Sequence, residues 1–234
     1  MPRAFFPMLF CGETCDAIEL RELQKLATQV QFRPGKMIFS EGEAADMVFG
    51  LSQGVVRLYK LLPDGRRQIL TFAIPGDFLG MPFADRHGFS ADAIDEVSSC
   101  RFPRDKLTKL IRSSPNIMRR LIEFATRELD MAQEQLLLLG NGSAEERVAM
   151  FLVNWRNRLS SFTPFSENVP LPMRRQDIAD FLGLKLETIS RTLAKLERKH
   201  MIRVVANGVS LTGLDQTLLV KGRNYSQIFE NSKS

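Results

Sequence analysis

The stretch RRQDIADFLGLKLETISRTLAKLERK at residues 174–199 constrains the fold of this chain more than any other stretch. Its apolar residues recur at the helical period on both sides of Gly183. Glycine permits a sharp turn between two short helices that share a small core. The pattern therefore predicts a helix-turn-helix, with Ile178, Ala179, Leu182, Leu186, Ile189, Leu193 and Leu196 as its buried side chains.

Two further patterns flank this unit. The residues MIRVVANGVSLT at 201–212 form two β-prone runs around Asn207-Gly208, which is a strong hairpin signal. The residues AEERVAMFLVNWRNRL at 144–159 predict an amphipathic helix with acidic residues in its first turn. Together they indicate a winged helix-turn-helix domain over residues 141–234.

Positive charge is concentrated in the same region. Residues 1–140 contain 18 Lys and Arg against 18 Asp and Glu, whereas residues 141–234 contain 14 against 9, so the whole excess of +5 lies in the second part. A basic domain beside a neutral one indicates a polyanionic partner, most simply double-stranded DNA. The alternative is an ordinary solvated surface.

The second helix of the pair carries the candidate contacts. If its apolar residues turn inward, Glu187, Ser190 and Arg191 face outward and can contact base edges in the major groove. Glu187 and Arg191 could instead form a surface ion pair worth only about 0.3 kcal/mol. The residues expected to contact the DNA backbone are Arg174, Arg175, Lys185, Thr188 and Lys195.

The first half of the chain has the sequence pattern of a β domain. From residue 31 to residue 102, short apolar runs alternate with glycines at the spacing expected of a sandwich or barrel. Pro63-Asp64-Gly65 predicts a tight hairpin turn, because proline presets one φ angle and glycine accepts a positive one. We expect an eight-stranded roll, which can hold a ligand, bind a metal or simply pack.

A long helix follows the roll. Its apolar residues repeat in steps of four and three, which indicates a parallel dimerisation helix. The alternative is a helix lying on the core of its own domain, and Leu121 and Phe124 widen the apolar face in that way. The predicted seam consists of Met118, Ile122, Ala125, Leu129, Ala132, Leu136 and Leu139.

These patterns divide the chain into four parts of an α+β protein. They are an N-terminal segment (1–20), a sensor-like β-roll of the jelly-roll type (21–112), a dimerisation helix (113–140) and the winged helix-turn-helix (141–234). No apolar run approaches the length of about 20 residues that a membrane span needs. Three cysteines and no secretion signal indicate the cytoplasm. The two histidines, His87 and His200, lie in different parts, and no catalytic constellation indicates an enzyme.

The motifs IPGDFLG (74–80), AEERVAMFL (144–152) and RRQDIADFLGLKLETISRTLAKLE (174–197) give the chain a resemblance to the cAMP receptor protein/FNR superfamily of bacterial transcription regulators. The E-x-x-S-R pattern resembles that of the FNR and FixK branch. The resemblance implies that Glu187, Ser190 and Arg191 contact bases in a palindrome of the TTGAT-N4-ATCAA type. It also implies a homodimer, contact with RNA polymerase, and activation or repression of genes linked to low oxygen or redox state.

The sequence departs from the superfamily's two well-known effector sites, the cyclic-nucleotide site and the iron–sulfur site. Its cyclic-nucleotide binders place Glu after the glycine of the PGDFLG-like stretch and Arg before a Ser or Thr, but this chain has Met81 and Phe89 there. These side chains cannot replace the ribose and phosphate contacts, so the sequence argues against cAMP binding.

The cysteines leave three alternatives open for the effector, of which the first is an FNR-like iron–sulfur cluster. Cys11, Cys15 and Cys100 supply three thiolates where the family uses four, and Asp16 or Glu13 would have to serve as the fourth ligand. A direct thiol redox response and the absence of any small effector are the other two alternatives. From a different functional class, the chain could be a dimeric ligand-binding regulatory module whose basic domain binds a protein partner.

Overall fold

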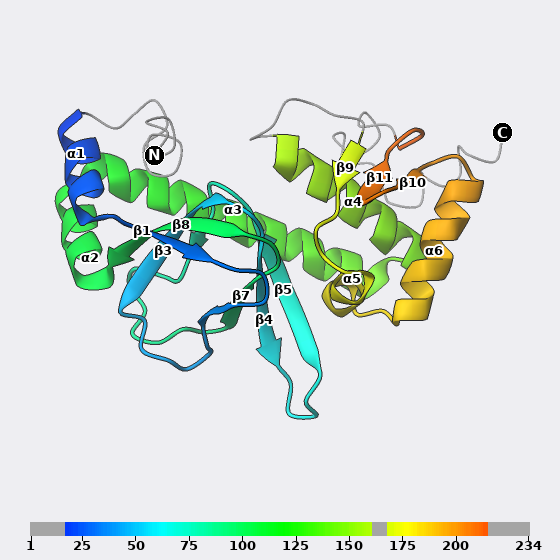
Figure 1. The fold of residues 1–234 in the computed structure, drawn as a ribbon, viewed down its shortest axis with the longest axis horizontal. Coiled ribbons are helices and arrows are strands. Elements are labelled where there is room, and N and C mark those ends of the chain that lie inside the picture. The colour runs from blue at the N-terminus through cyan, green and yellow to red at the C-terminus, as the bar shows by residue number, and fades with distance from the viewer. Residues whose placement is uncertain (1–16, 161–167, 215–234) are drawn as a thin grey trace. The chain divides into compact units, whose positions relative to one another are not determined.

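The computed structural model describes residues 17–160 and 168–214, and the chain divides into two compact units, residues 1–132 and 133–234. The first unit contains an antiparallel β-roll with helices beside it, and the second contains a helix-turn-helix with a small sheet (Figure 1). The predicted α+β class is confirmed. No helix in the described part of the chain is long and apolar enough to cross a membrane.

The roll consists, within the described residues, of two antiparallel sheets of four strands each, as the sequence predicts. Their strand orders are β1-β8-β3-β6 and β2-β7-β4-β5. Side chains of both sheets, among them the fully buried Leu51 and Val56, meet in one apolar core. The strands are β1 (Thr28–Phe32), β2 (Met37–Phe39), β3 (Met47–Gln53), β4 (Val56–Leu61), β5 (Arg67–Ala73), β6 (Phe78–Leu79), β7 (Ser90–Ala93) and β8 (Val97–Pro103).

The predicted turn at Pro63-Asp64-Gly65 joins β4 to β5. Gly65 has a φ of 80°, a conformation that glycine adopts without the steric cost of a Cβ atom. The amide of Leu62 donates a hydrogen bond to the carbonyl of Arg66 at 2.8 Å and closes the hairpin. The turn therefore forms for the reason that the sequence indicates.

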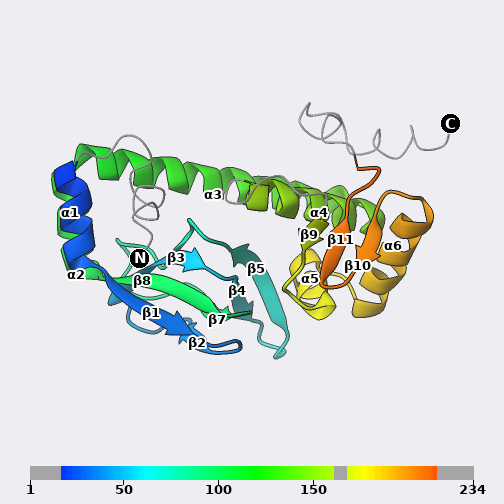
Figure 2. The ribbon, with the colours of Figure 1, turned by 45° about the horizontal axis from the view of Figure 1, so that its top comes forward.

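Two helices that the sequence patterns do not reveal cover one end of the roll. They are α1 (Ala17–Leu26) and α2 (Arg104–Ser113), and both lie beside the beginning of α3 (Pro115–Asn141) (Figures 1 and 2). The fully buried Leu23 of α1 belongs to a second apolar cluster, which joins α1 and α2 to the roll, so α1 crosses the boundary expected after residue 20. The buried members of this second cluster are Leu23, Val48, Cys100, Phe102, Leu107, Ile111 and Ile117.

The long helix α3 has 27 residues, which corresponds to about 40 Å. Leu121 packs against the second cluster, and the ring of Phe124 meets that of Phe78 edge to face at 5.5 Å. The wider apolar face therefore packs on its own roll, as expected. Within residues 133–141, the last turns of α3 belong to the second unit, so the unit boundary lies inside the helix.

The second unit, within its described residues, is built from α4 (Ala144–Ser160), α5 (Arg175–Leu182), α6 (Leu186–Arg198) and a sheet with the order β10-β11-β9. Its strands are β9 (Asn168–Pro170), β10 (Arg203–Val205) and β11 (Gly208–Ser210), which lie beside α4 and α6 (Figure 2). The hairpin at Asn207-Gly208 is confirmed. The third strand, β9, was not predicted, and the indole of Trp155 donates a hydrogen bond to the carbonyl of Pro170 at 2.8 Å beside it.

The predicted burial of one core residue of the helix-turn-helix is wrong. Leu186, the first residue of α6, is 38% exposed, whereas Thr192 is buried. At the first position of the helix, Leu186 lies beyond the layer in which Leu182, Ile189 and Leu193 meet. The other predicted core residues, including Ile178, Ala179 and Leu196, are buried.

Candidate DNA-binding surface

The turn between α5 and α6 sets the position of the candidate reading helix. Gly183 has a φ of 63° and a ψ of 36°, and the amide of Leu184 donates a hydrogen bond to the carbonyl of Ala179 at 3.0 Å. Glycine is favoured in this left-handed conformation at the end of a helix. At the other end of α5, the backbone amide of Arg174 donates to the carboxylate of the buried Asp177 at 2.9 Å.

The outer face of α6 presents the predicted base-reading residues. Glu187 and Arg191 are exposed, and Ser190 is half-buried. Within the described part of the chain, no ion pair joins Glu187 to Arg191, so the surface-pair alternative is not what the structure contains. A carboxylate, a guanidinium and a hydroxyl on one exposed helix offer acceptors and donors that match base edges.

The predicted backbone contacts fall into two groups. Arg174 and Arg175 are exposed at the start of α5, and Lys185 is exposed immediately before α6. Thr188 is half-buried in the first turn of α6. Lys195 differs from these residues, because its ammonium lies 2.5 Å from the carboxylate of Glu145 in α4.

Glu145 was not among the predicted site residues. Its side chain is only 13% exposed, and its two carboxylate oxygens accept from Lys195 and from Lys199. Burial by itself raises the pKa of Glu145, but the hydrogen bonds from the two lysines outweigh it and lower the pKa overall. The sequence shows Glu145 only as an acidic residue in the first turn of a helix, and its partners lie about 50 positions away.

Arg147 is a second residue that the sequence patterns missed. Its guanidinium donates to the carbonyls of Leu139 at the end of α3 (2.6 Å), Gly142 in the connection (2.9 Å) and Leu182 at the end of α5 (3.3 Å). The last carbonyls of a helix lack partners within the helix, so a planar cation is well suited to them. Arg147 thereby fixes α3's last turn, α4 and α5 to one another within the second unit.

The predicted dimerisation seam is exposed along α3. Ile122, Leu129 and Leu136 are 59%, 58% and 70% exposed. Ala125 and Ala132 are also exposed, whereas Met118 and Leu139 are half-buried. Met118 packs against the second cluster of the roll and so belongs partly to that core.

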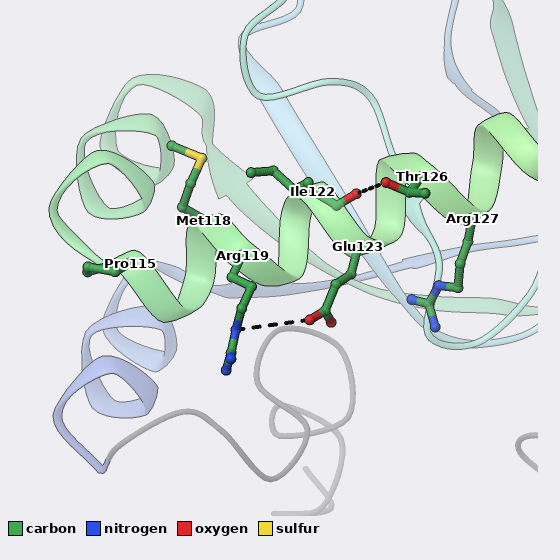
Figure 3. Close-up of a pocket in the computed structure, with 7 residues that line it drawn as sticks. All are labelled: Pro115, Met118, Arg119, Ile122, Glu123, Thr126 and Arg127. Atoms are coloured by element: carbon green, nitrogen blue, oxygen red, sulfur yellow. Dashed lines mark hydrogen bonds and ion pairs between the residues drawn. The ribbon is translucent and has the colours of Figure 1, made fainter.

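An open groove of about 660 Å³ follows the first turns of this helix. Figure 3 shows Met118 and Ile122 on one side of the helix and Arg119, Glu123 and Arg127 on the other. Glu123 accepts from Arg120 at 2.8 Å, and this hydrogen bond and the nearby cations lower the pKa of the carboxyl. The seam therefore runs between the roll's core and a charged, solvent-facing row.

Met81 and Phe89, whose side chains disfavour cAMP binding, lie in the roll. Met81 is 47% exposed, and the ring of Phe89 is 5.9 Å from that of Phe39. Phe89 thus lies among aromatic residues at the edge of the roll's core. A thioether and a phenyl ring offer no charge or strong hydrogen bond to a nucleotide.

Cys100 lies in the core of the roll. Its side chain is fully buried, and burial raises the pKa of its thiol to about 11. A cluster ligand must be a thiolate that reaches the metal, so Cys100 does not fit that role in this fold. Cys11 and Cys15 lie outside the described residues, and in residues 17–160 and 168–214 no group of three or more His, Cys, Asp and Glu could hold a metal ion.

Two family models match the chain. Residues 29–114 match the cyclic nucleotide-binding domain, and residues 146–219 match the Crp-like helix-turn-helix domain.

Two curated relatives and one solved structure are similar over most of their length. The chain is 52% identical to the transcriptional activatory protein AadR of Rhodopseudomonas palustris over 202 residues, covering 86% of this chain and 84% of AadR. It is 51% identical to the nitrogen fixation regulation protein FixK of Bradyrhizobium diazoefficiens over 196 residues, covering 84% and 83%. The structure of FixK2 from Bradyrhizobium japonicum matches with a TM-score of 0.74 at 35% identity, covering 87% of this chain and 96% of FixK2.

Proposed function

The chain belongs to the Crp/FNR family of DNA-binding transcription regulators, and we propose that it acts as a homodimeric activator on a palindromic DNA site. The observation that carries the proposal is the exposed outer face of α6, on which Glu187 and Arg191 are not engaged with one another. A helix of this width, presented by a fixed turn, enters the major groove of B-form DNA.

The residues on this surface divide into base readers and backbone contacts. Arg191 donates two hydrogen bonds to a guanine edge, Glu187 accepts from a cytosine amino group, and Ser190 contacts a neighbouring base. The recognised site is a palindrome of the TTGAT-N4-ATCAA type. The cations that position α6 on the phosphates are Arg174, Arg175 and Lys185, with the hydroxyl of Thr188 beside them.

Dimerisation through α3 supplies the two-fold symmetry that a palindrome requires. Three large aliphatic side chains, Ile122, Leu129 and Leu136, are more than half exposed at heptad spacing. A soluble chain rarely leaves such a row in water unless another surface covers it. A parallel copy of α3 has the matching row and places two α6 helices against successive turns of the groove.

The regulatory setting follows from the family and its relatives. AadR is described as a transcriptional activatory protein and FixK as a nitrogen fixation regulator. We place this chain in gene control linked to low oxygen or redox state, with RNA polymerase as its protein partner. The family resemblance assigns nucleotide contacts to the positions of Met81 and Phe89, and neither side chain can make them, so we infer that cAMP is not the effector.

The central experiment compares the full chain on the palindrome, on a single half-site and on scrambled DNA. Arg191→Ala is expected to lose about 1 to 3 kcal/mol per half-site on the palindrome and much less on scrambled DNA. Lys185→Ala is the matched control, since a phosphate contact weakens both DNAs alike and flattens the salt dependence by about one counterion per half-site. Equal losses on both DNAs for Arg191→Ala would remove it from the base readers.

The effector is tested separately. The protein is purified without oxygen, its visible spectrum is recorded, and DNA affinity is measured before and after exposure to air. Cys100 should stay unreactive towards a thiol reagent in the folded protein, because its thiol is buried and protonated at neutral pH. A nucleotide titration by calorimetry completes the set, and binding of cAMP at millimolar concentration or below would contradict the assignment of Met81 and Phe89.

A further inference from the structure

The recognition helix carries two lysines that do not face the same way as its base readers. At about 100° per residue, Lys195 and Lys199 lie on the flank of α6 between the face of Arg191 and the buried stripe of Leu196. This flank is turned towards the first turn of α4. There the carboxylate of Glu145 accepts from both ammonium groups, one oxygen to each lysine.

We propose that Glu145 withholds the charges of Lys195 and Lys199 from DNA and so raises the ratio of specific to non-specific binding. The proposal rests on the proposed function, because it assigns a role beside the base-reading face of α6. It makes Glu145 a specificity-determining residue that does not contact DNA itself.

The geometry favours a lasting contact over a loose surface pair. The side chain of Glu145 is 13% exposed, whereas the side chains of Lys195 and Lys199 are 54% and 37% exposed, so the carboxylate forms the inner end of the cluster. A carboxylate in the first turn of α4 and cations in the last turns of α6 also lie at the helix ends that favour their charges. Water therefore competes less for this carboxylate than for an exposed one.

The physical consequence concerns salt-dependent affinity. Lysine contacts to phosphate increase binding to every DNA sequence, because each contact releases counterions irrespective of the bases. A carboxylate that holds two lysines keeps this general attraction low and leaves the base contacts unaffected. The specificity ratio decides how well a regulator finds its site among many competing sequences.

The rest of α6 is held without Glu145. The carboxylate of Glu197 accepts from the backbone amide of Val204 in β10 at 2.8 Å, and Leu193 and Leu196 are buried beneath the helix. Replacement of Glu145 by the isosteric glutamine should therefore leave the fold intact. It removes the negative charge that Lys195 and Lys199 share and leaves the helix in its place.

The experiment measures affinity of the full-length protein for the palindrome and for scrambled DNA over a range of salt concentrations. For Glu145→Gln, binding to scrambled DNA should tighten roughly threefold or more, and its salt slope should steepen by up to about 1.8 per protomer. The ratio of the two affinities should fall accordingly. An unchanged ratio with an unchanged slope would overturn the proposal.

Glu146→Gln is the matched control. Glu146 is the adjacent carboxylate, and within residues 17–160 and 168–214 it accepts from the amide of Ser143 at 2.7 Å and from no lysine. The substitution changes the net charge by the same amount, so it should leave the slope on scrambled DNA close to that of the parent protein. An equal steepening in both variants would mean that net charge alone acts, and would overturn the proposal.

The lysines provide a test that does not depend on the folding of Glu145→Gln. With Glu145 intact, Lys195→Gln combined with Lys199→Gln should leave the salt slope unchanged, because these lysines do not contact phosphate. A slope lower by about 1.8 per protomer would overturn the proposal. If the parent protein shows no preference for the palindrome, the proposed function itself fails; if the preference is present and Glu145→Gln leaves it unchanged, only this inference fails.

Discussion

The interior of the β-roll and the outer face of α6 in the C-terminal unit use their polar side chains in opposite ways. In the roll, Arg57 and Asp92 form a two-pronged pair with distances of 2.9 and 2.6 Å, and their side chains are 14% and 12% exposed. In the C-terminal unit, Glu187 and Arg191 lie on the surface and do not pair. Polar groups that are paired inside a domain stabilise it, whereas polar groups left at the surface remain available to a ligand. The roll's interior therefore holds the shape of its domain, whereas the outer face of α6 is available to contact a polyanion.

The largest effect is expected where the seam of α3 is broken. Replacing Ile122 and Leu129 with glutamate places two unpaired charges per chain in the proposed dimer interface, which is strongly unfavourable. The variant should sediment as a monomer at micromolar concentration and bind the palindrome about 100- to 10,000-fold more weakly, since the two half-sites are no longer linked. Analytical ultracentrifugation and DNA titration measure these effects.

A control variant on the same helix sharpens this test. Asp130 is exposed on the solvent-facing side of α3, and Asp130→Lys should leave the dimer intact. If the double glutamate variant also stays dimeric, Ile122 and Leu129 do not form the dimer interface.

The next effect concerns the paired charges of the roll. Asp92→Ala leaves the guanidinium of Arg57 largely buried without its carboxylate, and the free energy of unfolding should fall by about 3 kcal/mol. Lys60→Ala, on β4 like Arg57, removes a pair with Glu41 in which the side chains of Lys60 and Glu41 are 46% and 39% exposed, and should cost less than about 1 kcal/mol. Urea unfolding measures both variants. Equal losses would contradict the distinction between interior and surface pairs.

A smaller loss is expected in the C-terminal unit from Arg147. Arg147→Leu removes hydrogen bonds to the carbonyls of Leu139, Gly142 and Leu182, and should destabilise this unit by about 2 kcal/mol. Hydrogen exchange should rise in α5 and α6 and remain unchanged in the strands of the roll. Arg147→Lys should show most of the same loss, because one ammonium cannot reproduce the planar fork of donors. Full protection in the lysine variant would show that charge alone suffices.

The smallest effect is a pH dependence in the roll. Burial lowers the pKa of His87, and the nearby carboxylates of Glu43 and Asp46 offset this only in part. The ring stacks on Phe39 at 3.7 Å. Since the folded protein binds this proton less tightly than the unfolded chain, stability is complete above the ordinary histidine pKa of about 6.5 and declines as the pH falls below it.

His87→Phe tests the assignment of this pH dependence. The substitution keeps an aromatic ring beside Phe39 and removes the titrating group, so the stability of the roll should vary less between about pH 7 and pH 5. Thermal unfolding over this range measures the difference. An identical pH profile in both proteins would assign the dependence to other groups.

Local patterns of the sequence account for much of the fold and of the candidate site. The helical period on both sides of Gly183, the turn at Pro63-Asp64-Gly65 and the hairpin at Asn207-Gly208 correspond to the structure. Each depends on residues within a few positions of one another, because helix periodicity and turn conformation are local properties. The strand β9 and the helices α1 and α2 were missed, since their short segments carry no clear period and are held by distant partners.

The sequence by itself determined the two architectures, the exposed polar face of α6 and the regular apolar row of α3. Only the tertiary structure decided that Lys195 lies against Glu145, that Leu186 is exposed and that Cys100 is buried in the roll's core. Helical spacing fixes the direction of a side chain around its own axis, but not which element packs against that side. Burial and ion pairing arise from contacts between segments far apart in the chain, so they are determined only when those segments pack together.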